Sequence, residues 1–136
     1  MTGHVLRQDE AGLCTLTLNR PEKLNALDTQ AFEELNQFIS ELEGQSNRIG
    51  CVMLRGAGKG FCAGADLKAM GTAPVPPAFK PGVIERLGKL PQPVIAAVHG
   101  VCFTGGLELA LACDFILADA SAVFSDTHGK WGLVGA

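Results

Sequence analysis

PVIAAVHGVCFTGGLELALA, residues 93–112, is the stretch that decides the fold. Val94 to Val98 is a short, uninterrupted apolar run, which predicts a buried strand. Gly105 to Ala112 predicts a helix that opens on two glycines. A buried strand that leads through a turn into a helix is typical of α/β proteins, in which the strands pair mainly in parallel. The stretch therefore predicts an α/β layer arrangement.

The same alternation continues upstream of this stretch. Leu13 to Asn19 alternates apolar residues with Thr or Cys and predicts a half-buried strand. Asp28 is a suitable N-cap for a helix that runs to about Glu43, with Gly44 just past its end. The apolar residues of this helix form one stripe, which we assign to the core: Phe32, Leu35, Phe38, Ile39 and Leu42.

The remaining segments complete the predicted order. Cys51 to Leu54 and Asp114 to Ala118 predict two more buried strands. The proline-rich stretch from Gly71 to Pro81 predicts a surface loop, and a short helix from about Val83 to Leu90 follows it. The sequence ends at Trp131-Gly-Leu-Val-Gly-Ala136 without a cap or a closing helix, so we expect residues 1–136 to be one incomplete domain.

Composition excludes several classes of protein. A length of 136 residues, with 47% apolar and 18% charged residues, indicates a globular chain rather than a disordered one. The net charge of -3 provides no basic surface for nucleic acid or for a membrane. No apolar run is long enough to cross a bilayer, and the polar first ten residues do not resemble a signal peptide. We expect a soluble cytoplasmic protein.

The five cysteines predict free thiols in a reducing compartment, because their number is odd and no CxxC pair occurs. No His or Cys pair has zinc-type spacing, so no metal is expected. Most of the thiols are expected to be buried and structural. The five are Cys14, Cys51, Cys62, Cys102 and Cys113.

Two glycine-rich turns could carry chemistry, because such turns leave N–H groups free and let a ligand approach the backbone. The first, GKGFCAGADL at 58–67, lacks the Ser or Thr of a phosphate-binding P-loop. Gly58, Gly60 and Ala63 fit the dinucleotide pattern G-x-G-x-x-A, with Glu85 placed as a ribose-binding acid. The receiving helix would, however, break in the proline-rich stretch. A nicotinamide site and a simple tight turn remain alternatives.

The second turn, His99 to Glu108, ends where a helix begins. Gly105 and Gly106 start that helix, so their amides point outward at the positive end of the helix dipole, which favours an anion. Glu108 lies in the first turn, where it could act as a general base beside such an anion site. Alternatively, Glu108 only complements the helix dipole.

Five blocks of the chain, taken in order, resemble the crotonase (enoyl-CoA hydratase/isomerase) family. They are NRPEKLNAL (19–27), KGFCAGADL (59–67), PVIAAVHG (93–100), TGGLELA (104–110) and CD (113–114). The similarity runs from about Val5 to Trp131 and covers only the N-terminal half of a complete family member. The resemblance implies a crotonase-like ββα spiral, truncated before the C-terminal helical region.

By this resemblance, the amides of Ala65 and Gly105 are the two donors of an oxyanion hole. They would hold the thioester oxygen of an acyl-CoA substrate as negative charge develops on it. Glu108 matches the family carboxylate that handles the proton of water. CoA arrives as part of the substrate, so the resemblance implies no separate cofactor.

The resemblance also places the CoA nucleotide in a cleft around the first turn. Arg20 or Lys23 could pair with its phosphates, whereas Lys23 and Lys68 taken singly also fit ordinary surface charges. The full set is Arg20, Lys23, Leu24, Ala26, Ala63, Gly64, Asp66, Leu67 and Lys68.

The chain departs from the family pattern at the second catalytic carboxylate. Alignment on Phe124 puts His128 at that position, with Asp126 two residues earlier. His128 could act as an acid or a base, because the unperturbed pKa of histidine is near neutrality. A solvent-facing loop histidine is the alternative.

The resemblance as a whole implies a lyase that adds water to 2-enoyl-CoA thioesters. Isomerase or thioester-hydrolase chemistry of the same family is one alternative. An inactive fragment that binds CoA or a subunit is another. Homotrimers or hexamers are typical of the family but are doubtful for a shortened chain.

Overall fold

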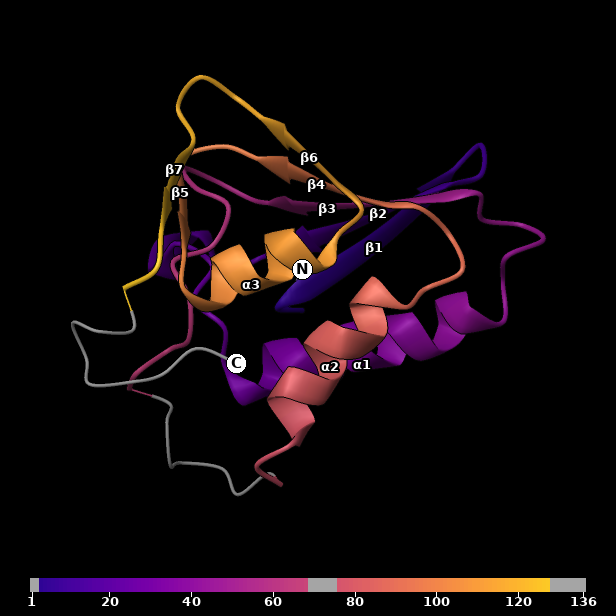
Figure 1. Cartoon of the computed structure of the whole chain (residues 1–136), viewed down its shortest axis with the longest axis horizontal. Helices are drawn as coiled ribbons and strands as arrows, with labels where there is room; N and C mark the ends of the chain where they lie inside the picture. The colour runs from indigo at the N-terminus through magenta and orange to yellow at the C-terminus, as the bar shows by residue number, and fades with distance from the viewer. Residues whose placement is uncertain (1–2, 69–75, 128–136) are drawn as a thin grey trace.

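The computed structural model describes residues 3–68 and 76–127, which form two sheets and three α-helices (Figure 1). The larger sheet has the order β1-β2-β3-β4-β6. Its first pair is antiparallel and the other three are parallel, so the predicted α/β arrangement with mainly parallel pairing is confirmed. Its strands are β1 (Val5–Glu10), β2 (Leu13–Leu18), β3 (Cys51–Gly56), β4 (Val94–Val98) and β6 (Phe115–Ala118).

The smaller sheet pairs β5 (Val101–Phe103) with β7 (Val123–Ser125) in parallel. Figure 1 shows these two strands at one end of the larger sheet, running across the direction of its strands. Cys62 joins the small sheet through an isolated bridge to Cys102 in β5. The chain that leaves β3 is therefore led away from the large sheet and against β5.

The first long helix, α1 (Thr29–Glu43), has the ends that its sequence predicts. The Asp28 carboxylate accepts a hydrogen bond from the amide of Ala31, and Gly44 follows the last turn. The predicted apolar stripe faces the core: Phe32, Leu35, Ile39 and Leu42 are buried, and Phe38 is partly buried.

All three helices lie on the same side of the large sheet, as Figure 1 shows for α1, α2 (Phe79–Gly88) and α3 (Gly105–Ala112). On this side of the central strands, Leu16, Leu54 and Ala96 lie across from one another and are fully buried. The core therefore sits between the sheet and the helices. Across the described ranges, no helix is both long enough and apolar enough to cross a membrane.

Two predicted boundaries near α2 are wrong. The helix begins at Phe79 and not at Val83, and it ends at Gly88. Pro81 lies in its first turn, where the missing N–H removes no helical hydrogen bond, so a proline there starts a helix as readily as it breaks one. Residues 71–75 of the predicted loop lie outside the described residues.

The prediction that Asp114 to Ala118 is a buried strand is also wrong. β6 is a strand, but it is the edge of the large sheet in the described part of the chain. Phe115 is 62% exposed and Leu117 is 59% exposed. Both side chains are on the sheet face that the helices do not cover.

The dinucleotide alternative is contradicted by the path of the chain after β3. All of residues 57–68 are described, and no helix begins among them to receive a pyrophosphate. Glu85, the expected ribose-binding acid, is exposed on α2, where its carboxylate pairs with Lys89 at 2.6 Å.

Candidate active site

The turn before α1 is held by the side chain of Asn25. A short 3-10 helix, η1 (Pro21–Lys23), leads into Leu24 and Asn25, whose φ angles are 50° and 56°. The Asn25 Oδ1 accepts from the amide of Arg20 at 2.8 Å. Its Nδ2 donates to carbonyl oxygens of the loop after β3: Ala57 and Gly60 at 2.9 Å and Phe61 at 3.2 Å. The turn and the loop are thereby fixed to each other.

The segment that follows this turn runs alongside the glycine-rich loop. Three backbone hydrogen bonds join them: Ala63 N–H to Leu24 O (2.9 Å), Leu27 N–H to Gly64 O (2.7 Å) and Asp66 N–H to Leu27 O (2.8 Å). Five of the residues expected at the CoA cleft are thereby brought together, namely Leu24, Ala26, Ala63, Gly64 and Asp66.

The other side of the glycine-rich loop packs against β5 and α3. The amides of Phe61 and Cys62 donate to Val101 O, and the amide of Phe103 donates to Cys62 O at 2.9 Å. Gly106 lies directly on this loop: a Cβ atom there would be 2.5 Å from the carbonyl oxygen of Cys62. Only a glycine lets the first turn of α3 approach so closely.

These contacts put the backbone of Gly105 beside that of Ala65. A Cβ atom at Gly105 would lie 3.5 Å from the amide nitrogen of Ala65 and 3.6 Å from the Cα of Gly64. Gly105 is the first residue of α3, so its amide has no helical carbonyl to bind. Ala65 is exposed, so this part of the loop is accessible to a ligand. The structure thus brings the two predicted donor residues together.

Glu108 lies one turn into α3, half-buried, and its amide donates to Thr104 O at 2.9 Å. Asp126 directly follows Ser125, whose carbonyl oxygen accepts from the amide of Thr104 at 2.9 Å. Both carboxylates therefore belong to segments that meet at Thr104. His128 lies outside the described residues, so its proposed role stays a prediction.

The remaining cleft residues lie on the outside of the two loops. Lys23 ends η1 and is exposed, as is Lys68, whose amide donates to the Asp66 Oδ1 at 3.1 Å. Leu24 and Leu67 are also exposed apolar side chains, at 39% and 38%. The rim of the loops therefore offers both cationic and apolar groups to a ligand.

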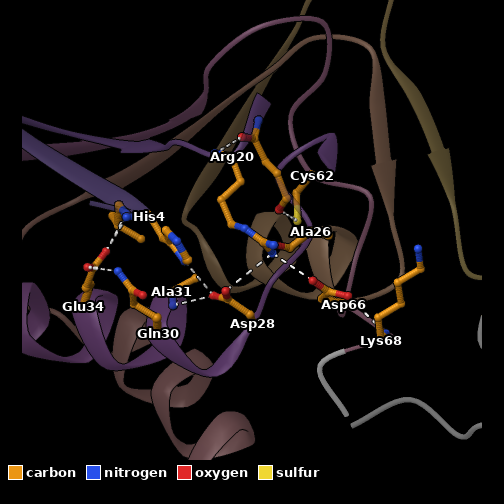
Figure 2. A network of polar contacts seen from close by, with 12 residues as sticks. His4, Arg20, Ala26, Asp28, Gln30, Ala31, Glu34, Cys62, Asp66 and Lys68 are labelled. Carbon is orange, nitrogen blue, oxygen red and sulfur yellow. Dashed lines mark hydrogen bonds and ion pairs between the residues drawn. The ribbon is translucent and has the colours of Figure 1, made fainter. Parts of the chain in front are cut away.

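Arg20 belongs to an internal ion-pair network, which the expectation of a phosphate contact did not foresee (Figure 2). Its Nη1 donates to Ala26 O at 2.7 Å and lies 3.1 Å from the Asp66 carboxylate and 3.6 Å from that of Asp28. Two carboxylates balance the charge of Arg20, so it is a poorer partner for phosphate than the exposed Lys23 or Lys68. Its evident role is to hold Ala26 and Asp66 in place.

Asp28 is the junction of this network, as Figure 2 shows. Besides Arg20, it binds the His4 Nδ1 at 2.9 Å and the amide of Ala31 at 2.9 Å. Desolvation by burial raises the pKa of Asp28. The hydrogen bonds from His4 and Ala31 and the charge of Arg20 outweigh that effect, so the pKa is lower than that of an ordinary aspartate.

The cysteine in the glycine-rich loop is unsuited to nucleophilic attack. Cys62 is fully buried, and burial raises the pKa of its thiol to about 12, so it stays protonated. Its Sγ–H donates to Asn25 O at 3.2 Å. All five cysteines are free, and burial also raises the pKa of Cys14, Cys102 and Cys113.

Two surface hollows lie away from the paired amides. One, at the carboxyl ends of β3, β4 and β6, is lined by Arg55, His99 and Asp119 among others. The other lies between α1 and α2. Neither contains a residue of the candidate site, whereas a third, smaller hollow is lined by Arg20, Asn25 and Ala26 among others. Residues 3–68 and 76–127 contain no group of three His, Cys, Asp or Glu side chains that could hold a metal ion.

The sequence did not identify the residues that hold the loops of the site in place but are not expected to contact a ligand. Asn25 and Thr104 were part of the motif blocks but had no assigned role, and Gly64 was expected only to contact CoA. The signal was weak because their importance depends on contacts between distant segments. An asparagine between Leu24 and Ala26 predicts a turn, but not which loop its amide will bind.

The fold and the paired amides define an α/β protein whose candidate site is built from backbone donors at the start of a helix. The model of the family described as Enoyl-CoA hydratase/isomerase matches residues 8–136. The chain belongs to the enoyl-CoA hydratase/isomerase family, and the expected family resemblance is confirmed.

Similar proteins agree with this family. The chain is 40% identical to the 1,2-epoxyphenylacetyl-CoA isomerase of Escherichia coli K12, over 98% of the chain and 54% of that protein. It is 38% identical to the short-chain-enoyl-CoA hydratase of Clostridium acetobutylicum, over 96% of the chain and 52% of that protein. The chain thus spans about half the length of the curated relatives it matches.

Solved structures show the same fold. An enoyl-CoA hydratase/isomerase from Xanthobacter autotrophicus Py2 matches with a TM-score of 0.89 and 36% identity, over 97% of the chain and 52% of that structure. An enoyl-CoA hydratase from Mycobacterium smegmatis matches with a TM-score of 0.88 and 36% identity, over 96% of the chain and 53% of that structure. The predicted crotonase-like fold, covering about half of a family member, is confirmed.

Proposed function

We propose that this chain carries the oxyanion hole of an enzyme that adds water to 2-enoyl-CoA thioesters. The observation that supports the proposal most directly is the meeting of the Ala65 and Gly105 backbones, since a Cβ atom at Gly105 would lie 3.5 Å from the amide nitrogen of Ala65. Two amides from separate segments meet at the start of a helix, where the dipole favours negative charge. Membership of the enoyl-CoA hydratase/isomerase family supports the same chemistry.

In the proposed reaction, the thioester oxygen binds between the two amides. The oxygen of water forms a bond to C3 of the substrate, and the electrons of the C2–C3 double bond move onto the thioester to form an enolate. Charge therefore develops on the oxygen that the amides hold, and preorganised donors stabilise that charge most in the transition state. A proton then adds to C2 and completes the hydration.

Glu108 is the proposed base that takes the proton from water. It lies in the first turn of the helix that begins at Gly105, so its side chain starts close to the oxyanion site. Asp126 or His128 is the proposed second group, which delivers the proton to C2. Asp126 follows the strand whose last carbonyl binds Thr104, which puts its backbone near the same site.

The CoA part of the substrate is proposed to lie along the rim formed by the two joined loops. Leu24, Ala63 and Leu67 offer an apolar surface, and Lys23 and Lys68 offer exposed positive charges for its phosphates. Arg20 supports this rim from inside through Ala26 and Asp66. CoA is consumed as part of the substrate, so the proposal needs no separate cofactor.

Isomerisation of an acyl-CoA is the second candidate. A relative that is 40% identical over 98% of the chain is named as a 1,2-epoxyphenylacetyl-CoA isomerase. An isomerase can use the same stabilised enolate without adding water, so the oxyanion hole alone does not separate the two reactions. The product separates them: only hydration gives a 3-hydroxyacyl-CoA.

The test uses the purified chain with crotonyl-CoA and follows the loss of the conjugated thioester absorbance. Glu108→Gln keeps the shape of the side chain but removes the base, so turnover should fall by about 100-fold or more. Glu33→Gln, an exposed change on α1, serves as the matched control and should leave turnover unchanged.

A binding measurement accompanies the assay. Acetoacetyl-CoA should raise the unfolding temperature of the wild type and of Glu108→Gln alike, because a ligand that binds only the folded state stabilises it. Full turnover by Glu108→Gln would refute the role of Glu108. A wild type that neither turns over crotonyl-CoA nor responds to acetoacetyl-CoA would contradict the proposed function of this chain.

A further inference from the structure

Thr104, the residue immediately before Gly105, has a backbone conformation that its side chain disfavours. Its φ is 49° and its ψ is −109°, a region that glycine enters freely and a β-branched residue almost never does. Such strain persists only where the surrounding structure imposes it, and it gathers at functional sites. Thr104 is also 92% buried, since only 8% of its surface is exposed.

The surroundings impose this conformation from both ends of the residue. The amide of Thr104 donates to Ser125 O in β7 at 2.9 Å, and its carbonyl oxygen accepts the first hydrogen bond of α3, from the amide of Glu108 at 2.9 Å. The chain must therefore leave a strand and enter a helix within one residue. The unusual φ and ψ of Thr104 turn the chain at that point and set the direction of the next amide, that of Gly105.

The Thr104 side chain fills the space between the two loops. A Cβ atom at Gly64 would lie 1.9 Å from the Thr104 Oγ1 and 3.3 Å from its Cβ. Gly64 is the residue before Ala65, and its own φ is +107°. The hydroxyl end of Thr104 therefore sits against the bare Cα of Gly64, beside the second donor residue.

We propose that Thr104 is the positioning residue of the oxyanion hole. Its strained backbone orients the amide of Gly105, and its side chain holds Gly64 and thereby Ala65 at a fixed separation from it. Thr104 need not touch the substrate; it acts through the two donors. This inference rests on the proposed function, because it assumes that the two amides bind a thioester oxygen. The positions of Ala65 and Gly105 relative to each other can be tested without any ligand.

The first test removes the side chain and relieves the strain together. Thr104→Gly should leave the unfolding temperature nearly unchanged, because relief of strain offsets the lost packing. The same variant should bind acetoacetyl-CoA about ten-fold or more weakly, since small misplacements of a preorganised site are costly. Its affinity for free CoA should not change, because free CoA lacks the thioester carbonyl whose oxygen the two amides would hold. The ratio of the two affinities is the measured quantity.

Ala11→Gly is the matched control. Ala11 also has a positive φ, 52°, but it lies in the exposed turn between β1 and β2, away from the site. The control should relieve backbone strain without altering the affinity ratio.

Two further variants separate the side chain from the backbone. Thr104→Ser keeps the Oγ1 against Gly64 and should keep the wild-type affinity ratio. Thr104→Ala keeps the backbone preference of a non-glycine residue but loses the hydroxyl and methyl groups. It should also bind acetoacetyl-CoA more weakly relative to free CoA, so it tests the proposal even if Thr104→Gly fails to fold.

A second readout needs no ligand. The amide protons of Ala65 and Gly105 should show a nuclear Overhauser effect in the wild type and in Thr104→Ser, and a weaker one in Thr104→Gly and Thr104→Ala. If the affinity ratio and the nuclear Overhauser effect between the two amides are the same in the wild type and in all three Thr104 variants, Thr104 does not position the donors. If the wild type binds no acetoacetyl-CoA, the proposed function fails. The nuclear Overhauser effect between the two amides then still decides whether Thr104 holds Ala65 and Gly105 in place.

Discussion

At the scale of single residues, Asn25 shows how one side chain can determine a long-range arrangement. It is 2% exposed, and its amide group satisfies the N–H of Arg20 and three carbonyl oxygens of the loop after β3. Its φ of 56° also suits asparagine better than most residues. The loop that carries Ala65 is thus positioned by a residue 40 positions upstream of Ala65.

Replacing Asn25 by Leu should destabilise the chain by about 3 kcal/mol or more. The apolar side chain would leave several buried backbone groups without partners, and each such group costs about 1–3 kcal/mol. Urea unfolding measures the change. Asn47→Leu, at an exposed turn, is the control and should cost less than about 0.5 kcal/mol. Equal effects of the two changes would show that the Asn25 hydrogen bonds contribute little.

Asp28 makes stability depend on pH in a defined direction. Its pKa in the folded chain is lower than the ordinary value of 3.8, so the charged form is favoured by folding. The resulting stability is fully present above the unfolded pKa and is lost as pH falls through the lower, folded one. Asp28→Asn keeps a helix cap but lacks the charge.

The wild type should therefore exceed Asp28→Asn in stability by about 1 kcal/mol at pH 7, and the difference should shrink below about pH 4. Unfolding in urea at a series of pH values measures it. Gln37→Ala, an exposed neutral change on the same helix, controls for general acid sensitivity. A difference that stays constant down to pH 3 would contradict the assignment.

At the scale of elements, α3 reaches the glycine-rich loop only because the residue of its first turn that faces the loop, Gly106, has no side chain. Gly106 and Gly82 are both helical glycines, but their surroundings differ. A Cβ atom at Gly106 would lie 2.5 Å from Cys62 O, whereas one at Gly82 in α2 would meet nothing within 4 Å. Helix propensity favours alanine at both sites, so packing alone decides the outcome.

Gly106→Ala should therefore destabilise the chain by about 2 kcal/mol, because α3 must move off the loop. Gly82→Ala should stabilise it by about 0.5–1 kcal/mol through helix propensity and a less flexible unfolded chain. The two thermal or urea unfolding curves form the comparison. A neutral or stabilising Gly106→Ala would mean that α3 does not rest on Cys62 as described.

At the scale of the whole molecule, the two edges of the large sheet differ in chemistry. β1 carries Arg7, Asp9 and Glu10, and such charges discourage pairing with another chain. β6, FILA, has none. Most of the large exposed apolar side chains in the described part of the chain lie on β6 and nearby elements: Leu111 (66%), Phe115 (62%), Leu117 (59%), Val123 (54%), Phe124 (42%) and Ile116 (37%).

The purified chain should therefore self-associate through this surface as its concentration rises. Phe115→Lys combined with Leu117→Lys should reduce the apparent mass in light scattering, because charge on an edge strand opposes pairing. Gln37→Lys with Ser46→Lys adds the same charge at exposed sites elsewhere and should leave association unchanged. Equal masses for all three proteins would place the contact on another surface.

Sequence alone determined the parts of this protein that depend on neighbouring residues. The Asp28 cap, the apolar stripe of α1, the apolar run of β4 and the two glycines that open α3 are local patterns, and each element formed where its pattern predicted. The family motifs likewise identified Ala65, Gly105 and Glu108 as candidates. α2 began earlier than predicted because a proline can start a helix as well as end one.

Tertiary structure alone decided how these elements meet. It paired the polar segment Val5–Glu10 with β2, left β6 at an exposed edge, enclosed Arg20 between two carboxylates, and set Thr104 against Gly64 beside the two donors. The physical reason is that strand pairing, ion pairing and close backbone approach join residues far apart in the chain. Their energies depend on distances that only the folded molecule defines.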